Sequence, residues 1–75
     1  MLRDVKGKAM VAYRLRVGDM FTYSGNNYDV LYRVCEHTYD PHGFHGVRAT
    51  YTKPDLTTGR QGLDGRIDVR LIESD

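Results

Sequence analysis

Cysteine is nearly absent from this chain of 75 residues, in which Cys35 is the only one. A single thiol cannot form an intrachain disulfide, and small secreted domains usually depend on several such bonds. The sequence therefore predicts an intracellular, cytoplasmic protein.

Long hydrophobic runs are also missing. No basic leader is followed by an apolar run of the kind found in signal peptides, and no apolar segment reaches the roughly 18 residues that cross a bilayer. We therefore expect neither a signal peptide nor a membrane partner.

The net charge is small, because 11 basic side chains oppose 10 acidic ones to give +1. A molecule of this charge has no overall field that attracts polyanions. The basic residues are most concentrated in the first sixteen positions, where five of them stand against one acidic residue. Any affinity for nucleic acid must come from such local groups.

Signatures of catalysis and of cofactor binding are missing as well. The chain has no G-x-S-x-G nucleophile elbow, EF-hand loop, Walker loop or dinucleotide fingerprint. Its acidic residues are scattered, and a domain of this size offers little concavity in which the pKa of a carboxyl could be raised. We expect no enzymatic activity, no cofactor and no small-molecule substrate.

What the chain does contain is an alternation of apolar and polar side chains with the two-residue period of β-strands. Five strands are expected, at residues 11–17, 20–23, 28–39, 44–52 and 66–72. They form one domain, preceded by a mobile arm at residues 1–8. The positions expected to face inward are Val11, Tyr13, Leu15, Val17, Phe21, Tyr28, Val30, Tyr32, Val34, Val47, Ala49, Tyr51, Ile67, Val69 and Leu71.

Turn-forming residues separate these strands. The sequence SGNN at residues 24–27 predicts a hairpin loop, and DPHG at residues 40–43 fits a type I turn. Pro54 is expected to end the fourth strand. Residues 55–65 contain three glycines and are expected to form a long exposed loop.

Five antiparallel strands joined mostly by tight turns indicate an all-β domain, either a small five-stranded antiparallel barrel or a strongly bent sheet. The run RVGDMFTYSGNNYDVLYRV, residues 16–34, resembles the opening half of SH3-like small barrels, where a Gly-Asp turn separates a first strand from a hairpin. The resemblance implies an SH3-like fold and no particular activity, since such barrels host many functions. An oligonucleotide-binding barrel is the rival, disfavoured because the chain is short and lacks its helix.

Residues of the types that bind zinc surround the second predicted turn. Cys35 and His37 are expected on one strand face, and His45 joins them only if Tyr39 pairs with His45 rather than with Phe44. No C-x-x-C or H-x-x-x-H spacing supports a site. We therefore predict no metal. The candidate ligands of a site here are Cys35, His37 and His45.

Two kinds of binding stay open. Several apolar side chains fall at outward strand positions, either as part of a protein interface or as a second layer of the domain's own core. They predict a small accessory or inhibitor protein that docks on a larger partner or on a second copy of itself. The candidate residues are Met20, Leu31 and Ile72.

The alternative is nucleic-acid binding, in which bases stack on aromatic rings beside basic side chains. Outward arginines and the two tyrosines outside the predicted core supply such groups. The candidates are Arg14, Arg16, Tyr23, Arg33, Tyr39 and Arg48.

Overall fold

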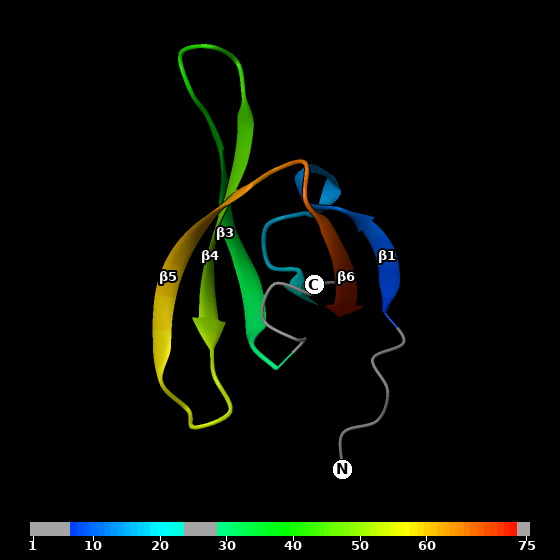
Figure 1. The fold of residues 1–75 in the computed structure, drawn as a ribbon, viewed down its shortest axis with the longest axis vertical. Helices are drawn as coiled ribbons and strands as arrows, with labels where there is room; N and C mark the ends of the chain where they lie inside the picture. The colour runs from blue at the N-terminus through cyan, green and yellow to red at the C-terminus, as the bar shows by residue number, and fades with distance from the viewer. Residues whose placement is uncertain (1–6, 24–28, 74–75) are drawn as a thin grey trace.

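The fold is a single antiparallel sheet of six strands in the order β1-β6-β2-β3-β4-β5, seen in a computed structural model that describes residues 7–23 and 29–73 (Figure 1). The strands are β1 (Lys8–Val11), β2 (Met20–Thr22), β3 (Leu31–Tyr39), β4 (His45–Thr52), β5 (Thr58–Asp64) and β6 (Asp68–Glu73), and a 3₁₀ turn, η1, spans Ala12–Arg14. The described part of the chain has no helix of the length and apolarity that a membrane span requires. The prediction of an all-β fold is confirmed.

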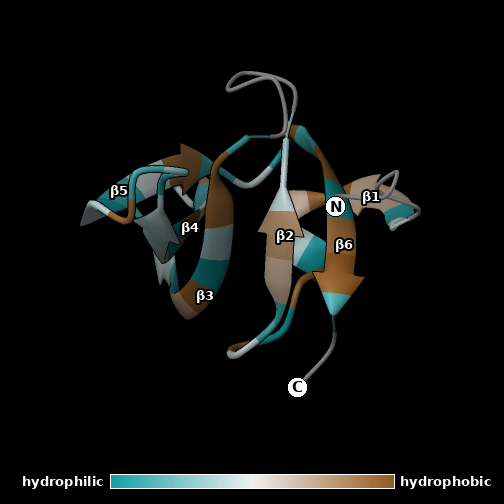
Figure 2. Cartoon of the chain, turned by 90° about the horizontal axis from the view of Figure 1, so that it is seen from below, coloured by the Kyte–Doolittle hydropathy of each residue, from teal (hydrophilic) through white to brown (hydrophobic). Residues whose placement is uncertain are grey.

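The sheet curls without closing, and β1 and β5 lie at its two ends (Figure 2). The molecule measures 43 × 25 × 22 Å. The β3–β4 hairpin projects beyond the other strands along the longest of these dimensions (Figure 1). Of the two predicted architectures, the barrel is therefore wrong for the described residues, whereas the bent sheet agrees with the curl. The described residues form six strands rather than five, and their sheet keeps two open edges.

The predicted strand over residues 11–17 is also wrong. β1 ends at Val11, and the N–H of Tyr13 in the following turn donates to the carbonyl of Gly65 at 2.8 Å. The buried residues here are Ala12 and Leu15, whose spacing of three matches a 3₁₀ turn. As a result Tyr13 and Val17, both expected inward, are 43% and 58% exposed.

The loop expected at residues 55–65 contains β5 instead. This strand pairs with β4 in unbroken register from Gly46↔Asp64 to Thr52↔Thr58. Its half-buried positions alternate with exposed ones. Two of the three half-buried residues are Gly59 and Gln61, so the sequence has no apolar alternation here that would predict a strand.

The remaining elements agree with the sequence. β2, β3 and β4 fall within the predicted strands at residues 20–23, 28–39 and 44–52. β6 matches the last predicted strand and ends one residue later, at Glu73. Most expected inward positions are buried or half buried, and Phe21 stacks on Tyr32 with ring centroids 5.2 Å apart. Residues 1–6, the loop at 24–27 and Tyr28 lie outside the described residues. Lys8, assigned to the mobile arm, belongs to β1.

The β3–β4 and β4–β5 loops, residues 40–44 and 53–57, share one backbone geometry. In each loop the N–H of the first residue donates to the carbonyl of the fifth, at 3.1 Å from Asp40 and 2.9 Å from Lys53. The N–H of the fourth residue donates to the carbonyl of the first, at 2.9 Å from Gly43 and 2.8 Å from Leu56. The predicted turn at residues 40–43 is thus confirmed. The fourth residue has a positive φ in both loops, +86° at Gly43 and +72° at Leu56. Glycine adopts this conformation freely, whereas leucine does so at a cost.

Leu56→Gly is expected to raise the free energy of unfolding by about 0.5–1 kcal/mol. The left-handed conformation costs an L-residue about 1–2 kcal/mol, more than the roughly 0.5–1 kcal/mol of added chain entropy that glycine brings. Little burial is lost, because Leu56 is 79% exposed. Urea denaturation followed by circular dichroism measures the change.

The reciprocal variant Gly43→Leu should lower stability by about 1 kcal/mol or more. A Cβ at Gly43 would meet nothing within 4 Å, so the cost isolates the backbone. Equal stability of both variants and the wild type would contradict the assigned loop geometry.

Candidate functional site

Exposed aromatic rings gather where the projecting β3–β4 hairpin meets the rest of the sheet. Tyr39 at the end of β3 is 69% exposed, Phe44 just before β4 is 57% exposed, and Tyr13 in η1 is 43% exposed. The Tyr39 and Tyr13 rings lie 4.6 and 5.8 Å from the ring of His45. The Phe44 ring lies 5.5 Å from the guanidinium of Arg66. We call these five residues the hairpin site.

Strand register decides which side chains meet there. Tyr39 pairs with His45 and His37 with Val47, so that all four side chains lie on the inner face of the sheet, where Val47 is buried. Of the two registers that the sequence leaves open, the structure has the one that brings His45 to His37.

The two imidazoles form a hydrogen bond, with Nδ1 of His37 and Nε2 of His45 2.6 Å apart. The other nitrogen of His37, Nε2, lies 2.7 Å from the carbonyl oxygen of Leu15. Because a carbonyl only accepts, His37 Nε2 donates to Leu15, and in neutral His37 Nδ1 accepts from His45. The pair therefore ties both strands of the hairpin to the segment after η1.

Cys35 does not join the two histidines. A β-bulge between Val34 and Glu36 shifts the alternation by one residue, so that Val34 and His37 both face inward while Cys35 is exposed. The expectation that Cys35 and His37 share a strand face is therefore wrong. Among the residues that the structure describes, no group of three His, Cys, Asp or Glu side chains could hold a metal.

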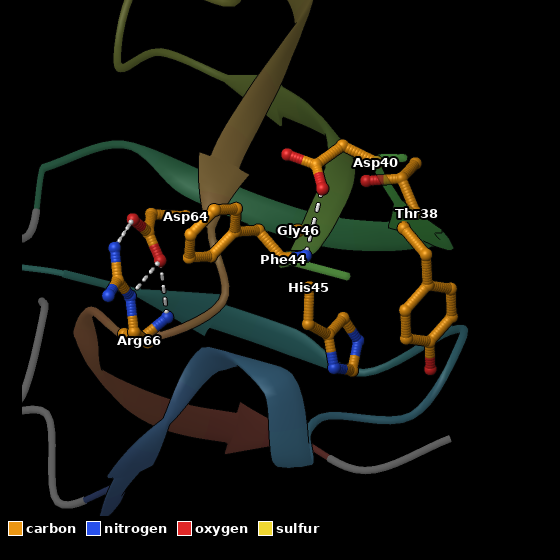
Figure 3. Close-up of a pocket in the computed structure, with 8 residues that line it drawn as sticks. Thr38, Asp40, Phe44, His45, Gly46, Asp64 and Arg66 are labelled. Atoms are coloured by element: carbon orange, nitrogen blue, oxygen red, sulfur yellow. Dashed lines mark hydrogen bonds and ion pairs between the residues drawn. The ribbon is translucent and has the colours of Figure 1, made fainter. Parts of the chain in front are cut away.

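A shallow pocket of about 450 Å³ opens between the hairpin and the turn after β5 (Figure 3). Phe44 and Arg66 line one side and His45 the other. Tyr39 also lines the pocket. The carboxylate of Asp40 fixes the loop above it by accepting the N–H of Phe44 at 2.9 Å. The pocket thus offers aromatic rings together with one cationic side chain, Arg66, and two carboxylates, Asp40 and Asp64.

Arg66 is held in place by Asp64. Its backbone N–H and Nε donate to Asp64 Oδ1 at 2.8 and 3.1 Å, and Nη2 lies 3.0 Å from Oδ2. Chiefly through the side-chain hydrogen bond and then the backbone one, Arg66 lowers the pKa of Asp64 from 3.8 to about 2. The same contact raises the pKa of Arg66.

The stabilising contribution of Asp64 is expected to disappear as the pH falls from about 4 to about 2. Its folded pKa lies below the ordinary 3.8, so the contribution is complete above that value and lost on approach to pH 2. Urea midpoints measured across this range should fall less steeply in Asp64→Asn than in the wild type. Asp55, whose pKa is lowered chiefly by the Thr57 hydroxyl, leaves a residual slope in the variant. Parallel curves would contradict the assigned contact.

The predicted partner-binding residues lie on three adjacent strands. Met20 on β2 is half buried and lies between β6, which carries Ile72, and β3, which carries Leu31. Leu31 and Ile72 are 42% and 37% exposed. They remain candidate contacts, away from the projecting end of the hairpin.

The predicted nucleic-acid residues are divided between the two faces of the sheet. Arg33 and Arg48 share the outer face, where Arg33 donates to the Gly18 carbonyl at 2.7 Å and Arg48 pairs with Glu36 at 2.8 Å. Tyr23 packs on the buried Tyr32, with ring centroids 5.3 Å apart. The expectation that Tyr23 lies outside the core is therefore wrong.

Tyr39 lies on the inner face, and Arg14 and Arg16 belong to η1 and the segment after it. The structure therefore does not assemble this set. A further outward arginine, Arg60 on β5, is missing from the prediction because its strand was expected to be a loop.

Three hairpin-site residues are not among the predicted binding residues. Tyr13 was assigned to the core, and nothing in the sequence links Phe44 to Arg66. One signal was available, since aromatic residues flank the turn at residues 40–43 on both sides. Comparison of the chain with protein-family models, with curated proteins and with solved structures gives no match in any of the three.

Proposed function

We propose that this domain is a non-enzymatic, cytoplasmic binding module that docks on a protein partner through the hairpin site, as an accessory or inhibitor protein would. The observation that carries the proposal is the gathering of three exposed aromatic rings from two segments remote in sequence. Tyr39 and Phe44 come from the hairpin, and Tyr13 comes from η1. Exposed apolar groups that gather in this way mark interaction sites more often than scattered ones do.

The composition of the site suits a protein interface. Tyrosine and arginine are enriched among the residues that dominate binding energy, and such anchors work best in well-packed surroundings. Here Tyr39 already packs against His45, with the two rings tilted by 31°, and Arg66 is held by Asp64. Because these side chains are ordered before a partner arrives, binding costs less conformational entropy.

The shallow pocket supports the same proposal. Its volume of about 450 Å³ accommodates a side chain of a partner, with Phe44 and Tyr39 on its walls (Figure 3). Its polar lining, Arg66 paired with Asp64 and the nearby Asp40, offers hydrogen-bonding groups to a polar side chain of a partner.

At the level of fold, we propose kinship with SH3-like small barrels. The turn at Gly18 and Asp19 supports it: Gly18 has a φ of +97°, and the buried Asp19 accepts the N–H of Arg16 at 2.8 Å. This kinship adds no activity, because such barrels host many.

Selection from a displayed library of random peptides tests the proposed function. Peptides that bind the wild-type domain should bind Tyr39→Ser and Phe44→Ser more than about tenfold more weakly, since truncation of an anchor residue typically costs 2 kcal/mol or more. Leu56→Ser is the matched control, because it removes an exposed apolar side chain from the opposite end of β4.

Two results would overturn the proposal. The first is a set of selected peptides that bind both hairpin variants as tightly as the wild type. The second is loss of binding in Leu31→Ser alone, which would move the interface to the face of Met20, Leu31 and Ile72.

Nucleic-acid binding is the second candidate, favoured by one observation. Arg33, Thr50 and Arg60 stand in register across β3, β4 and β5 on the outer face, with Arg48 on the same face. The observation is weaker, because the exposed rings lie on the other face and base stacking would lack a platform. Titration with single- and double-stranded oligonucleotides at two salt concentrations tests it, since phosphate contacts make affinity fall steeply with salt. Absence of binding at low salt would remove this candidate.

A further inference from the structure

We infer that two copies of this chain associate by antiparallel pairing of their β5 edges. β5 is the last strand of the sheet, and no described element lies beyond it (Figure 2). A strand in this position offers unpaired backbone groups to a further strand. The contact surface meets the hairpin site at Asp64, which holds Arg66. The inference does not depend on the proposed function.

The pattern of backbone bonds shows which groups of β5 point outward. A backbone hydrogen bond joins Lys53 to Thr57 at one end of the β4–β5 ladder, and another joins Gly65 to His45 at the other end. Because bonded and non-bonded pairs alternate in an antiparallel ladder, Gly59, Gln61 and Leu63 bond to β4. The N–H and C=O groups of Thr58, Arg60 and Gly62 therefore point away from the sheet.

The two edges of the sheet differ in how they are protected. β1 has four residues and begins with Lys8, and both features discourage edge pairing. β5 has seven residues, contains neither proline nor lysine, and pairs with β4 without a bulge. Of the two described edges, β5 is the longer and less protected, and its blocking groups are two charges of opposite sign, Arg60 and Asp64.

Charge along β5 selects a second copy of the chain as the occupant. Arg60 and Asp64 lie symmetrically about Gly62 and share the outer face. Antiparallel pairing of Gly62 with Gly62 of the second copy places each Arg60 opposite Asp64 of the other chain, whose carboxylate also binds Arg66 of its own chain. The two-fold symmetry repeats this pair of opposite charges at both ends, in an isologous contact.

Other registers are less favourable. Centring the pairing on Arg60 would set two like charges opposite each other, which destabilises cross-strand pairs. Centring it on Gln61 would leave Arg60 opposite Gly62, with no charge partner. The Gly62-centred register forms three bonded pairs, one between the two Gly62 residues and two between Arg60 and Asp64. The Asp64 carbonyl in these pairs also accepts the N–H of Ile67 of its own chain at 3.3 Å.

The outer face is open at the centre of the contact. A Cβ placed on Gly62 would meet nothing within 4 Å, so a side chain can be introduced here without strain within the chain. Dimerisation would also give each assembly two hairpin sites, and hence avidity for a partner that repeats its binding motif.

Sedimentation equilibrium of the full chain over a range of concentrations tests the inference. The wild type should form a dimer. Gly62→Pro should be monomeric, since it removes the outward N–H at the centre of the contact but no bond to β4. Gly62→Ala is the matched control, which keeps the N–H and should dimerise, and circular dichroism verifies that both variants are folded.

A second variant keeps the inference testable if Gly62→Pro does not fold. Arg60→Glu sets two acidic groups opposite each other and should weaken the dimer more than about tenfold, because like charges across a contact cost several kcal/mol. A wild type that stays monomeric at all concentrations would overturn the inference, as would a dimer that both Gly62→Pro and Arg60→Glu leave intact.

Disulfide trapping tests the register. In a Cys35→Ser background, Gly62→Cys should crosslink two chains under mild oxidation, because bonded antiparallel pairs have Cα atoms about 5.5 Å apart, within disulfide range. Thr58→Cys, on the same strand face, should not crosslink. Crosslinking through Thr58→Cys and not through Gly62→Cys would overturn the assigned register.

Discussion

Phe21→Ala is expected to lower the free energy of unfolding by about 3–5 kcal/mol. Domains are stable by only about 5–15 kcal/mol, and small ones lie near the lower end. The variant should therefore be largely unfolded or marginally folded at room temperature. Urea denaturation, followed by far-ultraviolet circular dichroism, measures the loss.

The size of this effect follows from the position of Phe21. Its side chain is fully buried and pairs on β2 with Tyr32 of β3 and Leu71 of β6, at the centre of the strand order. Truncation would leave a cavity between strands from both halves of the chain, which a rigid sheet cannot collapse to fill.

Phe44→Ala is the matched control, since Phe44 is the second of the two phenylalanines and is 57% exposed. Its stability should differ from the wild type by less than about 1 kcal/mol. Comparable losses for the two phenylalanines would contradict both the core described here and the assignment of Phe44 to a binding surface.

Gly65→Ala is expected to lower the free energy of unfolding by about 1–3 kcal/mol. A Cβ at this position would lie 2.6 Å from the carbonyl oxygen of His45 and 3.1 Å from Cβ of Tyr13. The first contact is with backbone, so it is relieved only if β4 and the turn separate. Because Gly65 bonds to both His45 and Tyr13, the hairpin site should be distorted together with the fold.

Gly62→Ala is the control here, since its Cβ enters open space three residues earlier. It should be as stable as the wild type, or slightly more stable because alanine restricts the unfolded chain. Near-ultraviolet circular dichroism should report a changed tyrosine environment in Gly65→Ala alone. Equal stability of the two variants would contradict the packing of η1 against the end of β4.

The sequence predicts those parts of the fold in which one side of a strand is uniformly apolar. Tyr32 and Val34 on β3, and Val47 and Ala49 on β4, satisfy this condition and are buried as expected. β5 does not, because a glycine and a glutamine occupy its inward positions. The Gln61 side chain is half buried and bonds to the hydroxyls of Tyr23 and Tyr32, so a polar group performs the role that alternation assigns to an apolar one.

The candidate site was harder to predict than the strands, because it depends on register and on a bulge. The extra residue at Cys35 turns the thiol away from His37. A strict two-residue alternation does not predict such a bulge. Tyr13 reaches His45 only because the chain leaves β1 through a 3₁₀ turn. Neither feature leaves a local mark in a single sequence.

The proposal that the hairpin site is a binding surface is tested most directly by nuclear magnetic resonance. Amide shifts of the isotopically labelled domain would be followed as the tightest peptide from the library selection is added. We expect the largest changes at Tyr13, Tyr39, Phe44, His45 and Arg66, with Arg33 and Arg48 on the outer face unmoved. Largest changes on the outer face or at Met20, Leu31 and Ile72, with the hairpin residues unmoved, would contradict the proposal.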